Sequence, residues 1–329
     1  MTLKMTVELL RWPTRERFVN SRGAKSETRT VLVTLRDSWG FTGRGEACGV
    51  DYAGETPELM AAQIDQVRPA VESTAAGREE LLKLLPSGGA RCALDGALWD
   101  LEAKRTGVSA FTLAGISVVR PVTTAYTIGI RTLDGYEAAA NERSCFAFLK
   151  VKVDRTDPIA AVAAVRRGAP RACLIVDSNQ AWSIDELKHF APQLADFGVV
   201  LLEQPIAIGE ERGLDGYRCP IKLCADELIY DVADIEKARG RFDVINIKLD
   251  KCGGLTAALR IAATASSAGF ELMVGCFGGS SLCMAPGMVL AQQCAFADLD
   301  GPLLSAADWP EGFVYHDGLV EPSKPALWG

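Results

Sequence analysis

Charged side chains recur at the ends of short apolar runs in this sequence. In FLKVKVD (residues 148–154) apolar residues alternate with lysines, so a β-strand would place Lys150 and Lys152 on one face and the apolar side chains on the other. Any one such charge could be a solvated strand end, but charges at the ends of so many strands indicate a common site. The other runs end in Asp177 (ACLIVD), Glu203 (VVLLEQ), Asp226 (IKLCAD), Lys248 (DVINIK), and Asp298 with Asp300 (AFADLD).

These runs belong to a regular alternation of strand-like and helix-like segments from about residue 121 onward. Amphipathic segments such as SIDELKHFAPQLADFG, in which Ser183 and Glu186 have the spacing of a capping box, separate most of the strands. The expected strands are TTAYTI, FLKVKV, ACLIVD, VVLLEQ, IKLCAD, DVINIK, ELMVGC and AFADLD. Parallel strands in this order predict a (β/α)8-type barrel, in which active sites lie at the carboxyl ends of the strands.

The flanking segments have a different pattern. Residues 1–50 are predicted to form strands, with a polar loop FVNSRGAKSE between the first two, and residues 56–106 are predicted to form helices. Strands followed by helices indicate a small α+β unit. We therefore expect an α/β protein in three parts: an α+β capping domain (1–118), a barrel with the active site (119–300), and a tail that returns to the capping domain (301–329).

The composition argues against several functional classes. The net charge is −7 and no basic run is present, so nucleic acid is not an expected partner. The N-terminus lacks the features of a secretory signal, and the longest apolar runs are too short to span a bilayer. The ten cysteines include no CxxC pair and several lie in apolar strands, which predicts buried, reduced thiols in a cytoplasmic protein.

Three carboxylates are expected to meet at the barrel mouth. Because strands three, four and five are neighbours, Asp177, Glu203 and Asp226 converge on one side. Carboxylates brought so close repel one another unless a cation lies between them. Oxygen ligands without histidine or cysteine suit a hard ion, so the sequence predicts Mg²⁺, with Mn²⁺ as the usual substitute.

Two lysines are expected to face each other across the same mouth. Strands two and six are four apart in a ring of eight, so Lys152 and Lys248 lie on opposite sides and can reach both faces of one carbon. A metal ion and the ammonium of Lys150 would lower the pKa of a lysine toward the range of a useful base. Removing a proton α to a carboxylate gives an enediolate, which a divalent cation stabilises. Return of the proton on the opposite face is racemisation or epimerisation.

This constellation resembles the enolase superfamily, in its muconate-lactonizing-enzyme-like subgroup. The motifs that carry the resemblance are LKVKV, IVDSN, LLEQP, ADE and NIKLDKCGG, and the likeness extends over essentially the whole chain. Within that subgroup, FADLDGP is similar to the DxD motif of dipeptide epimerases. The stretch FVNSRGAKSETRTVLVTL is similar to the cap loop of L-Ala-D/L-Glu epimerases. The resemblance implies a modified TIM barrel of the (β/α)7β type with an α+β cap.

The resemblance also implies a role for each motif residue. Asp177, Glu203 and Asp226 would bind Mg²⁺, while Lys152 and Lys248 would be the two acid/base residues. The remaining roles are Lys150 at the substrate carboxylate, Asp298 and Asp300 at the dipeptide ammonium, and Asn179 as the residue that orients Asp177.

Two loops are expected to form the side-chain pocket. Arg22 and Lys25 in the cap loop would supply the cation that a glutamate side chain needs. Cys276, in GCFGGSSL, ends strand seven, and the glycines of this loop leave room for a larger or different second residue. Tyr52 would either cover the site or form a surface turn, and Lys251 is expected at the start of the loop after strand six.

The predicted function is Mg²⁺-dependent 1,1-proton transfer at the Cα of the C-terminal residue of a dipeptide. L-Ala-D/L-Glu is the first-choice substrate and peptidoglycan recycling the setting, with another Ala-Xaa or Xaa-Xaa dipeptide as the nearest alternative. N-acylamino acid racemases, o-succinylbenzoate synthases and cycloisomerases need no ammonium site, so Asp298 and Asp300 argue against them. A Schiff-base aldolase would leave the three carboxylates without a purpose, and a non-catalytic binding protein would not need the whole set. The sequence is also compatible with a homo-oligomer.

Overall fold

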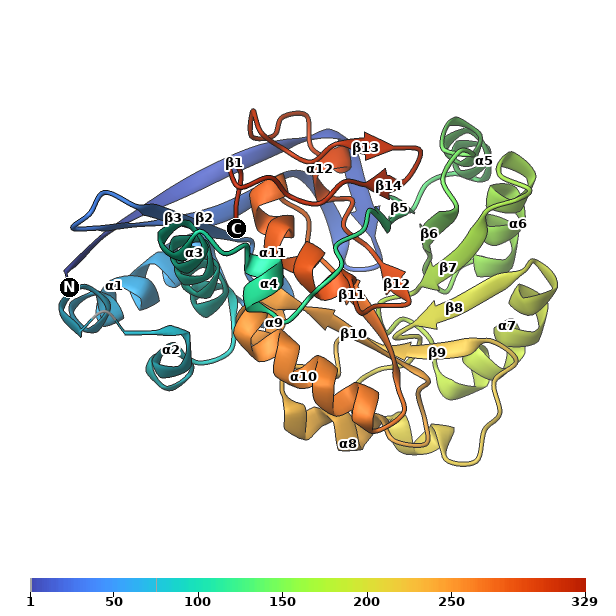
Figure 1. Cartoon of the computed structure of the whole chain (residues 1–329). Helices are drawn as coiled ribbons and strands as arrows, with labels where there is room; N and C mark the ends of the chain where they lie inside the picture. Colours follow the sequence, from blue (N-terminus) through green and yellow to red (C-terminus); the bar gives the residue numbers. More distant parts are fainter. Residues whose placement is uncertain (1, 75) are drawn as a thin grey trace.

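The structure is a computed structural model that describes residues 2–74 and 76–329. It contains a three-stranded antiparallel sheet with a helical layer, an eight-stranded parallel sheet that curves into a barrel, and a small three-stranded sheet. In Figure 1 the first sheet, in blue, lies over one side of the barrel, whose strands run from green to red. The predicted class, a modified β/α barrel with an α+β cap, is confirmed. Among the described residues, no helix is long and apolar enough to cross a membrane.

The N-terminal sheet is built around one long hairpin. The sequence predicted a polar loop over residues 18–27, whereas both strands continue to a turn at Ser21 and Arg22. That part of the prediction was wrong, because cross-strand backbone pairing continues through the polar segment. The hairpin is therefore long enough to reach the barrel mouth. Its strands are β1 (Leu3–Asn20) and β2 (Gly23–Asp37), and β3 (Thr42–Ala47) pairs with β2.

A helical layer packs on this sheet at very short range. The most extensive contact between the helices and the sheet is that of α3 with β3, where Gly43 and Gly45 expose their backbone to the helix. A Cβ at Gly45 would lie only 2.1 Å from the carbonyl oxygen of Ala93, so this approach requires glycine. The helices are η1 (Asp51–Ala53), α1 (Pro57–Thr74), α2 (Arg78–Leu84), α3 (Gly89–Thr106) and α4 (Ala110–Leu113).

All eight predicted barrel strands are present, and they are hydrogen-bonded in chain order. They are β5 (Ala125–Ile128), β6 (Phe148–Lys152), β7 (Cys173–Asp177), β8 (Val199–Glu203), β9 (Lys222–Ala225), β10 (Val244–Lys248), β11 (Glu271–Gly275) and β12 (Phe296–Ala297). Between them lie α5 (Leu133–Glu142), α6 (Pro158–Gly168), α7 (Ile184–Asp196), η2 (Glu211–Leu214), η3 (Val232–Asp234), α8 (Ile235–Ala238), α9 (Leu249–Cys252), α10 (Leu255–Ser267) and α11 (Ser281–Ala291). The capping box predicted for α7 is confirmed by reciprocal hydrogen bonds between Ser183 and Glu186.

An apolar layer fills the inside of the barrel below its mouth. Because side chains alternate along a strand, the residues two positions after this layer also point inward. On β7, β8 and β9 these later residues are Asp177, Glu203 and Asp226. The strand period thus stacks a charged layer on an apolar one. The apolar layer consists of Ala125, Ile175, Leu201, Cys224, Val244 and Met273.

The first and last barrel strands meet through side chains. β5 and β12 stand at the two ends of the hydrogen-bonded order. Thr124 Oγ1 accepts from the backbone N–H of Leu299 at 2.8 Å, and Asp300 Oδ2 accepts from the N–H of Thr127 at 2.6 Å. Asp300 therefore helps to close the barrel at its mouth.

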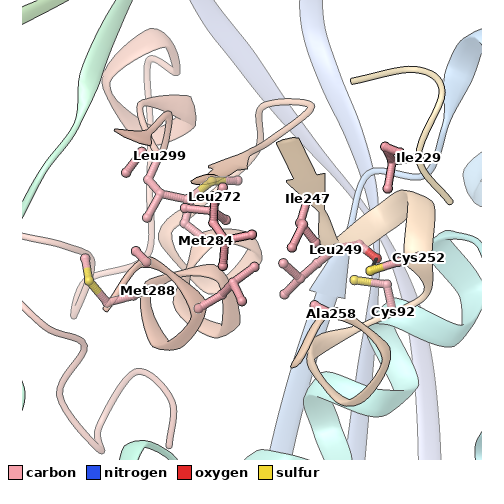
Figure 2. Close-up of a cluster of buried hydrophobic side chains, with 14 of the residues drawn as sticks. Cys92, Ile229, Ile247, Leu249, Cys252, Ala258, Leu272, Met284, Met288 and Leu299 are labelled. Carbon is pink, nitrogen blue, oxygen red and sulfur yellow. Dashed lines mark hydrogen bonds between the residues drawn. The ribbon is translucent and has the colours of Figure 1, made fainter. Parts of the chain in front are cut away.

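A large apolar core joins the barrel to the helical layer. Figure 2 shows part of this core, with Met284 of α11 near Leu272 of β11 and Cys92 of α3 near Cys252 of α9. All ten cysteines lie within the described residues and are free, and all but the exposed Cys145 are at least partly buried. Burial raises the pKa of Cys252 to about 12, so this side chain packs as a neutral, small apolar group.

The C-terminal segment returns to the N-terminal unit. The indole N–H of Trp328 donates to Gly96 O at 2.9 Å, and the N–H of Gly329 donates to Asp100 Oδ1 at 2.8 Å. Both acceptors belong to α3, so the chain ends against the helical layer. The segment also contains α12 (Gly301–Leu304), β13 (Tyr315–His316) and β14 (Leu319–Val320), which pairs with β4 (Val122–Thr123).

Candidate active site

Lys150 lies among the buried charges of the barrel mouth. It is 1% exposed, and its Nζ donates to Glu203 Oε1 at 2.9 Å and to Asp298 Oδ2 at 2.8 Å. Asp177 Oδ2 is 3.2 Å away. Burial opposes the charge of this ammonium, but Asp298 and Glu203 outweigh burial and hold its pKa well above the usual range of a lysine. One side chain thus links carboxylates from three strand ends.

Asp177, Glu203 and Asp226 lie at the ends of the neighbouring strands β7, β8 and β9 and are buried. Burial raises the pKa of Glu203 to about 8, and the negative charge of Asp177 adds to this effect. Burial would also raise the pKa of Asp177 and Asp226, but nearby lysines outweigh burial and lower the pKa of both carboxyls. The strongest of these is Lys152 for Asp177 and Lys248 for Asp226. The three carboxylates therefore depend on neighbouring cations for their charge balance.

The three carboxylates suit a hard divalent cation by their chemistry. Within residues 2–74 and 76–329, no group of three or more His, Cys, Asp or Glu side chains already has the spacing of a metal site, and the Lys150 ammonium lies among the carboxylates. Their donors are oxygen only, as Mg²⁺ prefers. Glu203 Oε2 is buried and lies 2.7 Å from Lys150 Nζ without a hydrogen bond of good geometry, so this oxygen can also serve as a ligand to a cation. Asp177, Glu203 and Asp226 are therefore candidate ligands.

Lys152 and Lys248 lie on β6 and β10, which are four strands apart in the barrel order. Lys152 Nζ donates to Asp177 Oδ2 at 2.5 Å, and Lys248 Nζ donates to Asp226 Oδ2 at 2.6 Å. Burial opposes the charge of Lys248, but Asp226 and Glu203 hold its pKa above the usual range. Both side chains line one cavity, so a small molecule there would meet an amine from each of two opposite strands.

Asp298 and Asp300 follow β12 at the same mouth. Asp298 Oδ1 accepts from Thr127 Oγ1 at 3.3 Å, in addition to the contact of its other oxygen with Lys150. Burial raises the pKa of Asp300 to about 8, and the neighbouring charge of Asp298 adds to the rise. Asp298 thus contacts Lys150, whereas Asp300 contacts the backbone N–H of Thr127 that helps to close the barrel.

A cavity of about 280 Å³ lies between the barrel mouth and the hairpin. Its barrel side is lined by the three lysines and by Asp298 and Asp300, and Cys276 forms part of one wall. Its other side is formed by hairpin residues that include Arg22 and Lys25. The volume is near the lower end of the range for small-molecule sites, about 300 Å³, and suits a ligand the size of a dipeptide.

Both hairpin cations have anionic partners. Arg22 forms an ion pair with Glu227, and its guanidinium carbon lies 4.3 Å from the centre of the Tyr52 ring. Lys25 forms an ion pair with Asp51, and the side chains of both are more than one-third exposed. The hairpin therefore holds Arg22 against the barrel and leaves Lys25 at the rim.

Two family models match the chain. The model described as "Enolase C-terminal domain-like" matches residues 135–326, and the model described as "Mandelate racemase / muconate lactonizing enzyme, N-terminal domain" matches residues 3–115. The chain belongs to the enolase superfamily. The first match spans most of the barrel, and the second spans the hairpin and its helical layer.

Similar proteins in the enolase superfamily are isomerases that act on amino-acid derivatives. The chain is 40% identical over 299 residues to the L-Ala-D/L-Glu epimerase of Escherichia coli (strain K12), covering 90% of this chain and 92% of that protein. It is 42% identical over 250 residues to the N-acetyl-D-glutamate racemase of a Pseudoalteromonas species, covering 76% and 79%. A solved dipeptide epimerase from Methylococcus capsulatus, complexed with Mg and L-Arg-D-Lys, is 30% identical, with a TM-score of 0.89 over 100% of this chain and 99% of that chain.

Sequence reasoning missed three polar residues of this site: Asn246, Thr127 and Glu227, the last of which contacts Arg22 and Asn179. Asn246 donates from Nδ2 to Glu203 Oε1 at 3.1 Å. It stands two residues before Lys248, so the period-2 rule that placed the lysine could also have found it. Thr127 contacts Asp298 and closes the barrel, but its strand, TTAYTI, carries no charge to mark it.

Lys251 does not lie where the sequence predicted. It was expected at the start of a loop, but it belongs to α9 and is 0% exposed. Its Nζ contacts Asp226 Oδ1 at 2.6 Å, so Asp226 has two lysine partners. A one-turn helix directly after β10 produces no periodic pattern, which explains the miss. Tyr52, by contrast, is half-buried and packs against Arg22 and Phe277, so it is not an exposed surface turn, but it does not itself line the cavity.

Asn179 contacts other groups in addition to Asp177. Its backbone N–H donates to Asp177 Oδ1 at 2.9 Å, consistent with the orienting role that the sequence suggested. Its φ is 49°, in the left-handed region that asparagine tolerates better than most residues. The side chain turns toward two other groups: Oδ1 accepts from Lys152 Nζ at 3.1 Å and Nδ2 donates to Glu227 Oε1 at 3.2 Å.

Proposed function

We propose that this chain is a Mg²⁺-dependent dipeptide epimerase that inverts the Cα of the C-terminal residue, with L-Ala-D/L-Glu as its first-choice substrate. The observation that carries the proposal is the placement of Lys152 and Lys248 on strands four apart, on one cavity, with three buried carboxylates on the strands between them. The E. coli relative, named L-Ala-D/L-Glu epimerase, supports the choice of substrate.

In the proposed reaction one lysine removes the α-proton and the other delivers a proton to the opposite face. The substrate Cα–H bond breaks, its electron pair passes into the adjacent carboxylate as an enediolate, and a new Cα–H bond forms on the other side. A divalent cation held by Asp177, Glu203 and Asp226 would supply positive charge beside the substrate carboxylate. Lys150 would add a second cation there, since its ammonium already lies among these groups.

The remaining cavity residues are assigned by charge. Asp298 and Asp300 would receive the dipeptide ammonium, because they are the anions on the side of the mouth away from the candidate ligands. Arg22 and Lys25 would receive the glutamate side chain, since they are the cations on the hairpin side. Cys276 would contribute apolar wall.

A second candidate is racemisation of an N-acylated glutamate. It is favoured by the 42% identity to a protein named N-acetyl-D-glutamate racemase and by the contact between Asp298 and Lys150, which already neutralises one carboxylate of the pair. The same lysines and cation would serve, and no ammonium site would be needed.

We also assign residues 1–118 to a capping domain, 119–300 to the barrel and 301–329 to a tail that returns to the cap. The long hairpin and the contacts of the last residues with α3 support this division. A cytoplasmic enzyme that recycles cell-wall peptide is the setting that a dipeptide of alanine and glutamate suggests.

The deciding experiment is a proton NMR time course in D₂O with Mg²⁺ and three substrates: L-Ala-L-Glu, L-Ala-D-Glu and N-acetyl-L-glutamate. Loss of the glutamate α-proton signal from a dipeptide, with growth of the other diastereomer, is the expected result. Exchange of N-acetyl-L-glutamate alone would establish the second candidate instead. Silence of all three would reject both glutamate substrates, and a library of Ala-Xaa and Xaa-Xaa dipeptides would be the next test.

A further inference from the structure

Arg22 at the hairpin tip and Lys152 at the barrel mouth are joined through two other side chains. Arg22 contacts Glu227 Oε1, which also accepts from Asn179 Nδ2 at 3.2 Å. Asn179 Oδ1 in turn accepts from Lys152 Nζ at 3.1 Å. We call the series Arg22–Glu227–Asn179–Lys152 the hairpin link. It runs from the N-terminal sheet to one of the two candidate acid/base residues.

The chemistry of each group fixes the direction of the hairpin link. A lysine ammonium only donates and an ionised carboxylate only accepts, so the Asn179 amide must turn its oxygen to Lys152 and its nitrogen to Glu227. Glu227 is 1% exposed, and its other oxygen, Oε2, has no hydrogen-bond partner among the described residues. Its placement therefore depends on Arg22 and Asn179. The left-handed backbone of Asn179 adds strain that persists only while its surroundings hold it.

The hydrogen bonds of the hairpin link end at Lys152. The described contacts of Lys248 run instead to Asp226 at 2.6 Å and Glu203 at 3.9 Å, with its Nζ 4.9 Å from the centre of the Phe277 ring. Within the part of the chain that the structure describes, Glu227 acts on Lys248 only through its charge. Arg22 reaches Glu227 through Nη2, and a guanidinium has further N–H donors in the same plane. An anionic substrate side chain can therefore bind Arg22 without displacing Glu227.

We propose that Glu227 is a positioning residue that couples the seating of Arg22 to the placement of Lys152, and so governs proton transfer on one face of the substrate carbon. The inference rests on the proposed function, because it takes Lys152 and Lys248 to serve opposite faces. Binding of an anionic side chain at Arg22 fixes Glu227 and Asn179 and holds the Lys152 amine toward Cα. Binding of the second residue of the dipeptide thereby places the Lys152 amine for proton transfer.

The test is face-specific hydrogen exchange in D₂O. Lys152→Ala and Lys248→Ala each leave one lysine able to exchange the α-proton of one epimer without inverting it, which assigns L-Ala-L-Glu and L-Ala-D-Glu to the two lysines. Glu227→Leu keeps the side-chain size but removes both acceptor oxygens. It should slow exchange of the Lys152 epimer by about tenfold to a hundredfold, since a misplacement of about 1 Å costs about a hundredfold. It should change the Lys248 epimer no more than Glu227→Gln does, because both variants remove the charge of Glu227 that acts on Lys248.

Three comparisons make the result decisive. Glu227→Gln retains an oxygen acceptor and should restore most of the loss. Asp51→Asn breaks the ion pair with Lys25, which lies on the same hairpin as Arg22. It should change the exchange rates of both epimers by one common factor. The Mg²⁺ concentration for half-maximal exchange should be the same in Glu227→Leu as in the wild type.

An equal loss for both epimers in Glu227→Leu, or no loss, would overturn the coupling, since damage to the fold or to cation binding gives the first pattern. If Glu227→Leu does not fold, Arg22→Met carries the same test with a smaller ratio between the epimers, because it removes the hairpin partner of Glu227. A wild-type protein that exchanges neither dipeptide would defeat the proposed function and this proposal together, whereas an active wild type with symmetric variants defeats this proposal alone.

Discussion

The ammonium of Lys150 lies 2.8 Å from the carboxylate of Asp298 and joins the two halves of the barrel mouth. The same ammonium contacts Glu203, one of the candidate metal ligands. The cation proposed for the substrate carboxylate and the anion proposed for the substrate ammonium therefore neutralise each other. A dipeptide carries both charges and can replace this buried internal pair with two pairs of its own. An N-acylated amino acid carries only the carboxylate.

Asp298→Asn should separate these two substrate classes. It removes the anion that would meet the ammonium, so kcat/KM for L-Ala-L-Glu should fall by about a hundredfold or more, in line with about 2–5 kcal/mol for losing one partner of a buried charge pair. The value for N-acetyl-L-glutamate should change far less. Steady-state kinetics on both substrates make the comparison. Equal losses would mean that Asp298 acts on Lys150 rather than on the substrate amine.

The pH dependence should identify Asp300. Burial and Asp298 raise the pKa of Asp300 to about 8, so at lower pH its carboxyl is mostly protonated and cannot pair with an ammonium. The kcat/KM for the dipeptide should therefore fall as the pH falls below about 8. Above about 8 the α-amino group of the dipeptide loses its own proton, so activity should fall again. A pH–rate profile of kcat/KM measures both limbs.

Two controls assign these limbs to their groups. Asp300→Asn cannot be protonated and should lose the acid limb that Asp300 causes. N-acetyl-L-glutamate has no amine to titrate and should lack the alkaline limb. A wild-type dipeptide profile that stays flat between about pH 6 and about pH 8 would contradict the role of Asp300.

Removal of divalent cations should stop proton exchange and lower thermal stability. Asp177, Glu203 and Asp226 are buried together, so a cation that binds only the folded chain adds about 2.7 kcal/mol at a hundred times its Kd. Dialysis against EDTA should abolish exchange, and Mg²⁺ or Mn²⁺ should restore it and raise Tm. Glu203→Gln should lose the Mg²⁺-dependent rise in Tm. Full exchange by chelator-treated protein would exclude the cation from the reaction.

The barrel and its charged strand ends could be predicted because two simple rules govern them. Alternation places Lys150 and Lys152 inside, and the carboxyl ends of parallel strands share one rim, so Asp177, Glu203 and Asp226 meet. These rules act within a strand or between neighbours, and a sequence displays them directly.

Other features depend on contacts between distant segments, which no local period records. The contact of Arg22 with Glu227 joins residues 205 positions apart. Lys251 lies in a helix of a single turn and is identified only by its contact with Asp226. Asn179 contacts Asp177 through its backbone N–H as expected, but the contacts of its side chain with Lys152 and Glu227 could not be predicted.

Asp95→Asn should stabilise the protein at alkaline pH. Asp95 is 1% exposed, and burial raises its pKa to about 6 although Thr256 donates to it from Oγ1 at 2.5 Å and from N at 3.1 Å. Because the pKa is higher in the folded state, the stability it contributes is present below about pH 4 and is lost as the pH rises through about 6. About 2–3 kcal/mol should be missing at about pH 8.

Asparagine keeps an oxygen acceptor for Thr256 and carries no charge. Urea unfolding should therefore show Asp95→Asn to be more stable than the wild type at about pH 8, with the advantage gone at about pH 4. The same difference at both pH values would mean that packing, rather than the buried charge, separates the two proteins.

Arg22→Met should weaken recognition of an anionic second residue. A charged hydrogen bond to a substrate carboxylate contributes about 1.5–3 kcal/mol, so kcat/KM for L-Ala-L-Glu should fall by about tenfold to a hundredfold. L-Ala-L-Leu has no such carboxylate and should lose less. Lys25→Met should cost either dipeptide only about fivefold or less, because Lys25 is 44% exposed and exposed ion pairs contribute about 0.2–1 kcal/mol.

The ratio between the two dipeptides separates the two roles that Arg22 can have. If Arg22 binds the substrate side chain, Arg22→Met lowers kcat/KM for L-Ala-L-Glu well below the loss for L-Ala-L-Leu. If Arg22 acts only by holding Glu227, both dipeptides lose activity equally, because Lys152 is then misplaced whatever the second residue. A large loss for Lys25→Met with none for Arg22→Met would instead move the anion site to the hairpin rim, where Lys25 pairs with Asp51.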